Sequence, residues 1–122
     1  MPSEKIKLPL DLSYLYEISD DDREFIYEMI RTIVNNTPPI LKEIKEAGEK
    51  EKWTELGRLL HKFKPSLLLL NIDYLSTLIR SAENNAKKEN NIEDIPSQLI
   101  ELNQLCEILL KELNDLIETD RY

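Results

Sequence analysis

Apolar residues recur in alternating three- and four-residue steps along the chain, and this spacing constrains the fold more than any other feature. One stretch shows the pattern clearly, with apolar residues at Trp53, Leu56, Leu60, Phe63 and Leu67. Such steps place the side chains on one face of an α-helix, whereas a half-buried strand requires strict alternation. The sequence contains no strand-like alternation, so it predicts an all-α protein.

Four segments carry the helical spacing, and short polar stretches separate them. They cover residues 20–47, 51–70, 72–88 and a last segment that begins near Pro96. A shorter apolar segment, residues 11–19, precedes them. Four amphipathic helices joined by short loops are typical of an antiparallel up-and-down four-helix bundle. We expect residues 11–19 to add a short N-terminal cap helix over one end of it.

The first long helix, predicted over residues 20–47, contains the clearest start and stop signals. Ser19 or Asp20 can cap its N-terminus, and the acidic residues that follow suit the positive end of the helix dipole. Gly48 is a favourable C-terminal stop. The sequence TPP at residues 37–39 interrupts the segment, and proline in a helix interior produces a kink or a fresh start capped by the threonine. We predict one bent helix.

Length and charge limit the domain organisation and the partners. The 122 residues fit a single domain, with a flexible arm at residues 1–10 and the bundle at residues 11–118. Sixteen basic and twenty-four acidic residues give a net charge of −8, which repels phosphate backbones and argues against nucleic acid. We expect a monomer, because a bundle of this size can bury its own core.

Cysteine content and hydropathy point to the cytoplasm. The single cysteine, Cys106, cannot form an internal disulfide, and it falls in the apolar stripe of the last predicted helix. The N-terminal sequence MPSEKIKLPL lacks the apolar run of a signal peptide, and no segment approaches membrane-spanning length. We therefore expect a cytoplasmic protein that has no membrane partner.

The only histidine, His61, lies in the stretch LLHKFKPSLLLL, residues 59–70. At 100° per residue it falls roughly 130° from the middle of the apolar stripe, so we place it on the outer face of its helix. Its neighbours one turn away are Gly57 and Arg58 on one side and Lys64 and Pro65 on the other. Arg58 either contributes to docking or pairs with an acidic neighbour such as Glu55, and the sequence leaves both possibilities open.

The basic residues around His61 favour a modification that adds negative charge to its imidazole. Flanking cations do not stabilise a protonated ring, but they do stabilise a phosphoryl group on a ring nitrogen. Pro65 removes the hydrogen bond that the carbonyl of His61 would otherwise accept, and it leaves a low surface beside the ring. Leu68 lies two turns away on nearly the same side, so it predicts an apolar docking surface next to the histidine.

These residues resemble a known family. The segment LGRLLHKFKPSLLLL is similar to the H-x-x-K-G segment of histidine-containing phosphotransfer (HPt) domains, and DLSYLYEISDDDREFIYEMI resembles their usual opening. The resemblance covers about residues 11–118 and includes the Thr-Pro inside the first long helix. The chain departs from the family pattern at Pro65, where the family has a glycine, and at Asn71, where a second glycine is usual.

The resemblance implies a phosphorelay intermediate in two-component signalling. Such a domain accepts a phosphoryl group from the phospho-aspartate of one receiver domain and passes it to the aspartate of another. His61 would be the acceptor, Lys64 would balance the phosphoryl charge, and Gly57, Arg58, Pro65 and Leu68 would contribute to the docking surface. The partners would be response-regulator receiver domains and a hybrid sensor histidine kinase.

A phosphocarrier of this kind is not an enzyme with its own ATP site. The sequence has no Walker-type glycine-rich loop and no second histidine for a metal site, so we expect neither a cofactor nor a bound metal. The partner receiver would supply the Mg²⁺. The alternative is a helical-bundle adaptor or inhibitor that docks a receiver or a kinase without being phosphorylated. His61 separates the two hypotheses, because an adaptor does not require a histidine at that position.

Overall fold

The computed structural model describes residues 12–119 and contains only helices within that range. In chain order the elements are α1 (Ser13–Ile18), α2 (Arg23–Glu49), α3 (Trp53–Leu69), α4 (Asp73–Lys88), the 3₁₀ turn η1 (Ile92–Asp94) and α5 (Ile95–Thr119). The prediction of an all-α protein is confirmed. The predicted arm, residues 1–10, lies outside the described residues. Among the described helices, none is long and apolar enough to cross a membrane.

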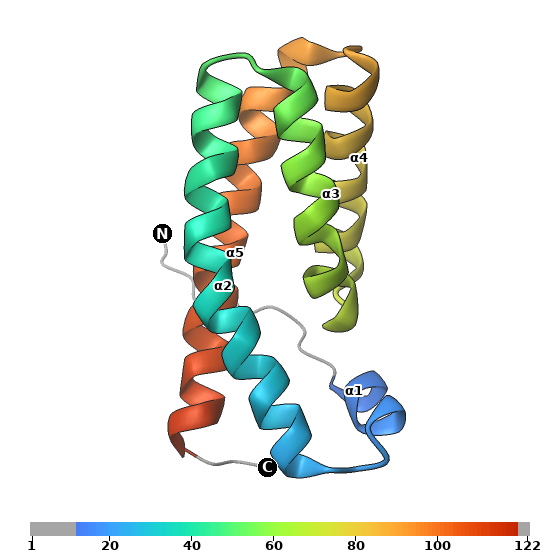
Figure 1. Cartoon of the computed structure of the whole chain (residues 1–122), viewed down its shortest axis with the longest axis vertical. Helices are drawn as coiled ribbons and strands as arrows, with labels where there is room; N and C mark the ends of the chain where they lie inside the picture. The colour runs from blue at the N-terminus through green and yellow to red at the C-terminus, as the bar shows by residue number, and fades with distance from the viewer. Residues whose placement is uncertain (1–11, 120–122) are drawn as a thin grey trace, which may run out of the picture.

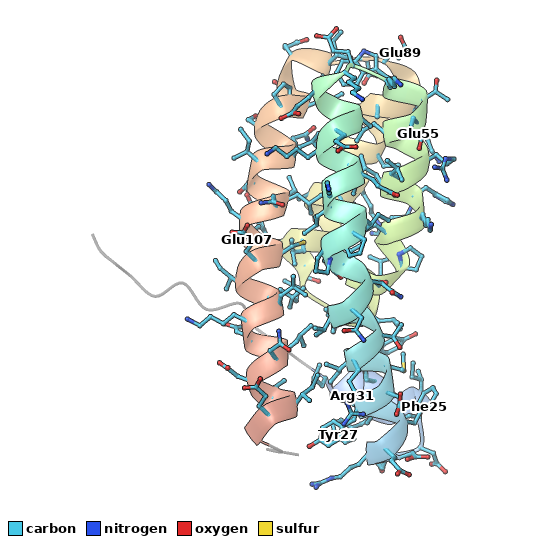
Figure 2. All side chains as sticks on the ribbon, turned by 60° about the vertical axis from the view of Figure 1, so that its left-hand side comes forward. Phe25, Tyr27, Arg31, Glu55, Glu89 and Glu107 are labelled. Carbon is cyan, nitrogen blue, oxygen red and sulfur yellow. The ribbon has the colours of Figure 1, made fainter. Side chains whose placement is uncertain are left out.

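Helices α2 to α5 run alternately up and down, and α1 lies at one end of the bundle (Figure 1). The predicted antiparallel four-helix bundle with a short N-terminal helix is therefore confirmed. Helices α2 and α5 extend beyond α3 and α4, and α1 lies on the side where the shorter pair ends (Figure 1). Figure 2 shows Phe25, Tyr27 and Arg31 on this extended part of α2, where the Arg31 guanidinium lies 5.8 Å from the centre of the Tyr27 ring.

The apolar stripes meet in one continuous core, as amphipathic helices require. Each long helix contributes side chains that are almost fully buried: Ile26 and Ile30 from α2, Leu56, Leu60, Phe63 and Leu67 from α3, Leu75 and Ile79 from α4, and Leu102, Cys106, Leu109 and Leu113 from α5. Burial of this kind stabilises a bundle by about 1.5–3 kcal/mol for each large side chain. The core leaves the outer faces of the helices free to carry function.

Helix α2 is continuous through both prolines, and it changes direction midway along its length (Figure 1). The predicted single bent helix is therefore present. Thr37 does not cap a new helix, because its buried hydroxyl donates a 2.6 Å hydrogen bond to the carbonyl of Ile33 inside the same helix. Pro38 and Pro39 cannot donate backbone hydrogen bonds, which accounts for the bend.

Both ends of α2 differ from the sequence-based prediction. Asp20 and Asp21 adopt positive φ angles of 58° and 62°, and the N-cap is Asp22, whose side chain accepts a 3.2 Å hydrogen bond from the amide of Phe25. The expected cap at Ser19 or Asp20 was wrong by two or three residues. Gly48 does not stop the helix. It lies inside α2 against Leu99, where an added Cβ would come within 2.5 Å of the leucine Cδ1.

The hairpin of α3 and α4 positions the predicted site. Asn71 adopts a positive φ of 56° just beyond Leu70, the C-cap of α3, and the chain reverses there, so the predicted break is confirmed. On the opposite side of α4, Asn85 donates a hydrogen bond to Gln98 of α5, and Gln98 donates one to Ser81. These contacts fix the position of α4 between α3 and α5.

Candidate functional site

His61 lies on the outer face of α3, as the helical spacing predicted. Its side chain is 62% exposed, whereas Leu60 and Phe63, on either side of it in the sequence, are buried in the core. A helix position gives the ring a fixed direction, because side chains on helices have few allowed rotamers. The imidazole is therefore presented to solvent from a rigid support.

A buried carboxylate from the neighbouring helix holds one ring nitrogen. The Nδ1 atom of His61 lies 2.8 Å from Oε2 of Glu83 on α4. The Glu83 side chain is only 8% exposed, although a lone charge at such a position is costly. A buried acidic side chain needs compensating partners, and the site provides them.

Two lysines neutralise Glu83. The Nζ atom of Lys64 lies 2.8 Å from Oε1, and the Nζ atom of Lys87 lies 2.8 Å from Oε2. Burial raises the pKa of the Glu83 carboxyl, but the hydrogen bonds from Lys64, Lys87 and His61 outweigh burial and lower that pKa to about 2. Glu83 is therefore a carboxylate at neutral pH and can only accept hydrogen bonds.

The charge of Glu83 determines which ring nitrogen can react. Because the carboxylate can only accept, Nδ1 of His61 must be the donor in the 2.8 Å contact. In the neutral ring the lone pair then belongs to Nε2. The arrangement provides a nucleophilic nitrogen on an exposed ring and a carboxylate that can stabilise positive charge on that ring.

The Lys64 side chain points to the carboxylate of Glu83 rather than over the imidazole ring of His61. Its side chain is 22% exposed, and its ammonium group reaches Glu83 on the neighbouring helix. The ion pair joins α3 to α4 directly beside the histidine. Lys64 therefore lies in the site, as expected, and its partner in the unmodified protein is the buried carboxylate.

Two residues expected at the docking surface have structural partners. Gly57 is buried rather than exposed, because it lies in the contact between α3 and the Lys87 side chain of α4. Its expected place on the exposed docking surface was therefore wrong. Arg58 is exposed and pairs with Glu55, through contacts of 3.2 Å from Nε and 2.6 Å from a terminal nitrogen. Figure 2 shows Glu55 on the outer side of α3.

An apolar hollow of about 400 Å³ lies one turn beyond His61. It is lined by Tyr14 of α1, by Pro65, Leu68 and Leu69 of α3, and by Asn71. Tyr14 is 45% exposed, Pro65 is exposed, and both leucines are half-buried. The two residues expected next to the histidine, Pro65 and Leu68, thus share one concave surface with a residue of the N-terminal helix.

The sequence reasoning missed Glu83, Lys87 and Tyr14. A signal for Glu83 was present, because it follows Ile79 by four residues and lies beside Ala82 on the apolar stripe of α4. A charged residue on a buried stripe requires a partner, and Lys87 follows it by a further four residues. The third residue, Tyr14, carried no comparable signal, since its contact with α3 depends on how α1 packs.

No other cluster in the described part of the chain offers comparable chemistry. Residues 12–119 contain no group of three or more histidine, cysteine, aspartate or glutamate side chains able to hold a metal ion. Burial raises the pKa of the Cys106 thiol to about 12, so that the thiol stays protonated in the core. The charged groups of the site converge on Glu83, and His61 is the exposed member of that cluster.

The fold and the site define a helical bundle that presents one exposed histidine, whose ring is hydrogen-bonded to a buried carboxylate. The family model described as "Hpt domain" matches residues 28–119. The chain therefore belongs to the Hpt domain family, and this membership supports a role in histidine phosphotransfer within a two-component phosphorelay. Searches of the curated proteins and of the solved structures gave no match.

Proposed function

We propose that the protein is a phosphorelay intermediate that carries a phosphoryl group on Nε2 of His61 between the aspartates of two receiver domains. The observation that carries the proposal is the 2.8 Å contact between Nδ1 of His61 and the ionised Glu83. This contact keeps the proton on Nδ1 and leaves the Nε2 lone pair available on an exposed ring. A hydrated surface histidine without such a partner would distribute its proton between both nitrogens.

The transfer step is a displacement at phosphorus. The Nε2 lone pair attacks the phosphorus of an aspartyl phosphate, the phosphorus–oxygen bond breaks, and its electron pair leaves with the aspartate carboxylate. Nδ1 keeps its proton, so that the phosphorylated ring carries positive charge that Glu83 stabilises. Transfer to the second receiver reverses these changes, and Nε2 recovers its lone pair.

Lys64 contributes positive charge next to the acceptor. In the unmodified protein its ammonium group pairs with Oε1 of Glu83, within one helical turn of His61. Phosphorylation adds negative charge at the ring, and a flexible lysine at this position can then share its charge between the carboxylate and the phosphoryl oxygens. Reactions of this kind depend mainly on positioning and charge stabilisation.

The hollow formed by Tyr14, Pro65 and Leu68 supports a docking role for this face. An apolar concave surface one turn from the reactive nitrogen can position a receiver domain so that its aspartate reaches His61. We further propose that the receiver brings its own Mg²⁺ and that the bundle binds no ATP. The expectations of a monomer and of a cytoplasmic location remain predictions.

Phosphoryl transfer from a receiver tests this proposal. The protein is mixed with a receiver domain that carries a radiolabelled aspartyl phosphate, and the label is followed onto the bundle. We expect an acid-labile, base-stable phosphate on the wild-type protein and none on His61→Gln. Binding of the receiver without any transfer of label would favour the adaptor function instead. Label on the glutamine variant would contradict the assignment of His61.

A further inference from the structure

Two donors share one oxygen at the site. Nδ1 of His61 and Nζ of Lys87 each lie 2.8 Å from the same Oε2 atom of Glu83, while Lys64 binds Oε1. A cation that binds a carboxylate oxygen lowers the basicity of that oxygen, so it weakens the hydrogen bond that a second donor makes to the same atom. Lys87 therefore affects His61 without touching it.

Gly57 provides the space in which Lys87 lies. It precedes His61 by four residues, so it occupies the same side of α3 one turn earlier. A Cβ atom added at Gly57 would come within 2.8 Å of Cγ of Lys87, but it would lie 3.6 Å from the Lys87 amide nitrogen. A side chain at position 57 would thus displace the stem of Lys87 and leave the backbone of α4 in place.

We propose that Lys87, which lies over Gly57, is a positioning residue that limits how strongly Glu83 holds the Nδ1 proton of His61. By doing so it shortens the lifetime of the phosphohistidine. This inference rests on the proposed function for its second part only. The first part concerns the unmodified protein. Lys87 is 48% exposed, so its contribution comes from the contact with Glu83 rather than from core packing.

The lifetime depends on the Nδ1 proton because of how the phosphorus–nitrogen bond breaks. In hydrolysis, a water oxygen attacks phosphorus, the electron pair of the phosphorus–nitrogen bond returns to Nε2, and both water protons leave with inorganic phosphate. The ring departs as a neutral imidazole only if Nδ1 keeps its own proton. A stronger hydrogen bond from Nδ1 to Glu83 stabilises the positive charge that the ring loses when it departs, so loss of Lys87 prolongs the lifetime.

The first test uses nuclear magnetic resonance of the unmodified full chain. His61 is the only histidine, so its two ring nitrogens give one assignable pair of ¹⁵N signals. In Lys87→Ala we expect the Nδ1 signal to move toward the position of a protonated nitrogen and the Nε2 signal to move toward that of a lone-pair nitrogen. Lys87→Arg should restore the wild-type positions, and Lys88→Ala, one residue further on, should not change them.

The Gly57→Ala variant tests whether the space at Gly57 holds Lys87 in place. We expect it to move the ring signals in the same direction as Lys87→Ala, because it displaces the same ammonium group. The double variant should match Lys87→Ala alone, since no lysine is left to displace. Unchanged signals in Lys87→Ala, or an effect of Gly57→Ala that adds fully to that of Lys87→Ala, would overturn the proposal.

The second test measures the phosphorylated form. The chain is phosphorylated with phosphoramidate as a small donor, and loss of phosphate is followed by ³¹P resonance. We expect Lys87→Ala to lose phosphate about two- to tenfold more slowly than the wild type, and Lys87→Arg to be close to the wild type. Loss of phosphate from Lys87→Ala at the wild-type rate or faster would contradict the second part of the inference. If the wild type takes up no phosphate, the proposed function fails, and the nitrogen signals still decide the first part.

Discussion

Nδ1 of His61 and Oε2 of Glu83 lie 2.8 Å apart across the contact between α3 and α4, although 22 residues separate them in the chain. This pair joins an exposed ring to a buried charge, so a change at either residue affects both the reactivity of the site and the stability of the fold. Substitutions in and around the pair can separate these two effects.

Glu83→Gln should weaken both functions of the carboxylate. An amide cannot neutralise Lys64 and Lys87, so we expect a loss of about 1–3 kcal/mol in the free energy of unfolding. The amide also cannot stabilise positive charge on the ring, so acceptance of the phosphoryl group should slow by about tenfold or more. Urea unfolding and the rate of label transfer measure the two effects. Glu93→Gln, on the exposed turn η1, is the matched control and should behave as the wild type.

The free energy of unfolding should depend on pH through the ionisation of Glu83. Its pKa in the folded protein is about 2, below the ordinary value of 4.5, so the unfolded chain takes up this proton first as the pH falls. The stabilising contribution is therefore complete above pH 4.5 and is lost between about 4.5 and 2. The difference in unfolding free energy between the wild type and Glu83→Gln should shrink over that range. A difference that stays constant there would contradict the ionised state of Glu83.

Lys64→Ala should slow phosphoryl acceptance by about tenfold, because the charge-assisted contacts available to the phosphoryl group decrease. Lys62 is a suitable comparison, since it is exposed and lies two residues earlier on the same helix. Lys62→Ala should transfer at the wild-type rate. Equal slowing in both variants would show that general positive charge, rather than the position of Lys64, matters.

Leu68→Arg should weaken receiver docking about tenfold without changing the intrinsic reactivity of His61, because it places a charge in the apolar hollow. The dissociation constant for a receiver domain measures docking, and phosphorylation by phosphoramidate measures reactivity. Ile100 of α5 is 60% exposed and lies beside a groove between α2 and α5, away from the histidine. Ile100→Arg should leave both quantities unchanged, and an equal loss of affinity there would contradict the assignment of the docking face.

Local patterns predicted most of the fold. The helical spacing around Leu60 and Phe63 determines which side of α3 is buried, so it also determined that His61 is exposed. The N-cap of α2 was misplaced because several consecutive acidic residues can cap a helix equally well, and the positive φ angles of Asp20 and Asp21 decide between them. Such backbone choices depend on how α1 connects to α2.

The site was predicted only in part, because its contacts cross between helices. Lys64 was assigned to the histidine by its spacing, but its contact with Glu83 depends on the packing of α3 against α4. Gly57 was assigned to the docking surface because it lies one turn from His61, whereas its small size admits the Lys87 side chain. In both cases the sequence identified the residue, and the relative position of two helices determined what it contacts.

The decisive measurement for this site is which atom of the protein carries the phosphoryl group. The ¹⁵N-labelled protein is phosphorylated by a receiver domain, and the nitrogen bonded to phosphorus is identified from its ³¹P–¹⁵N coupling. We expect phosphorus on Nε2 of His61, with a proton retained on Nδ1. Phosphorus on Nδ1, or on any residue other than His61, would disprove the proposed acceptor.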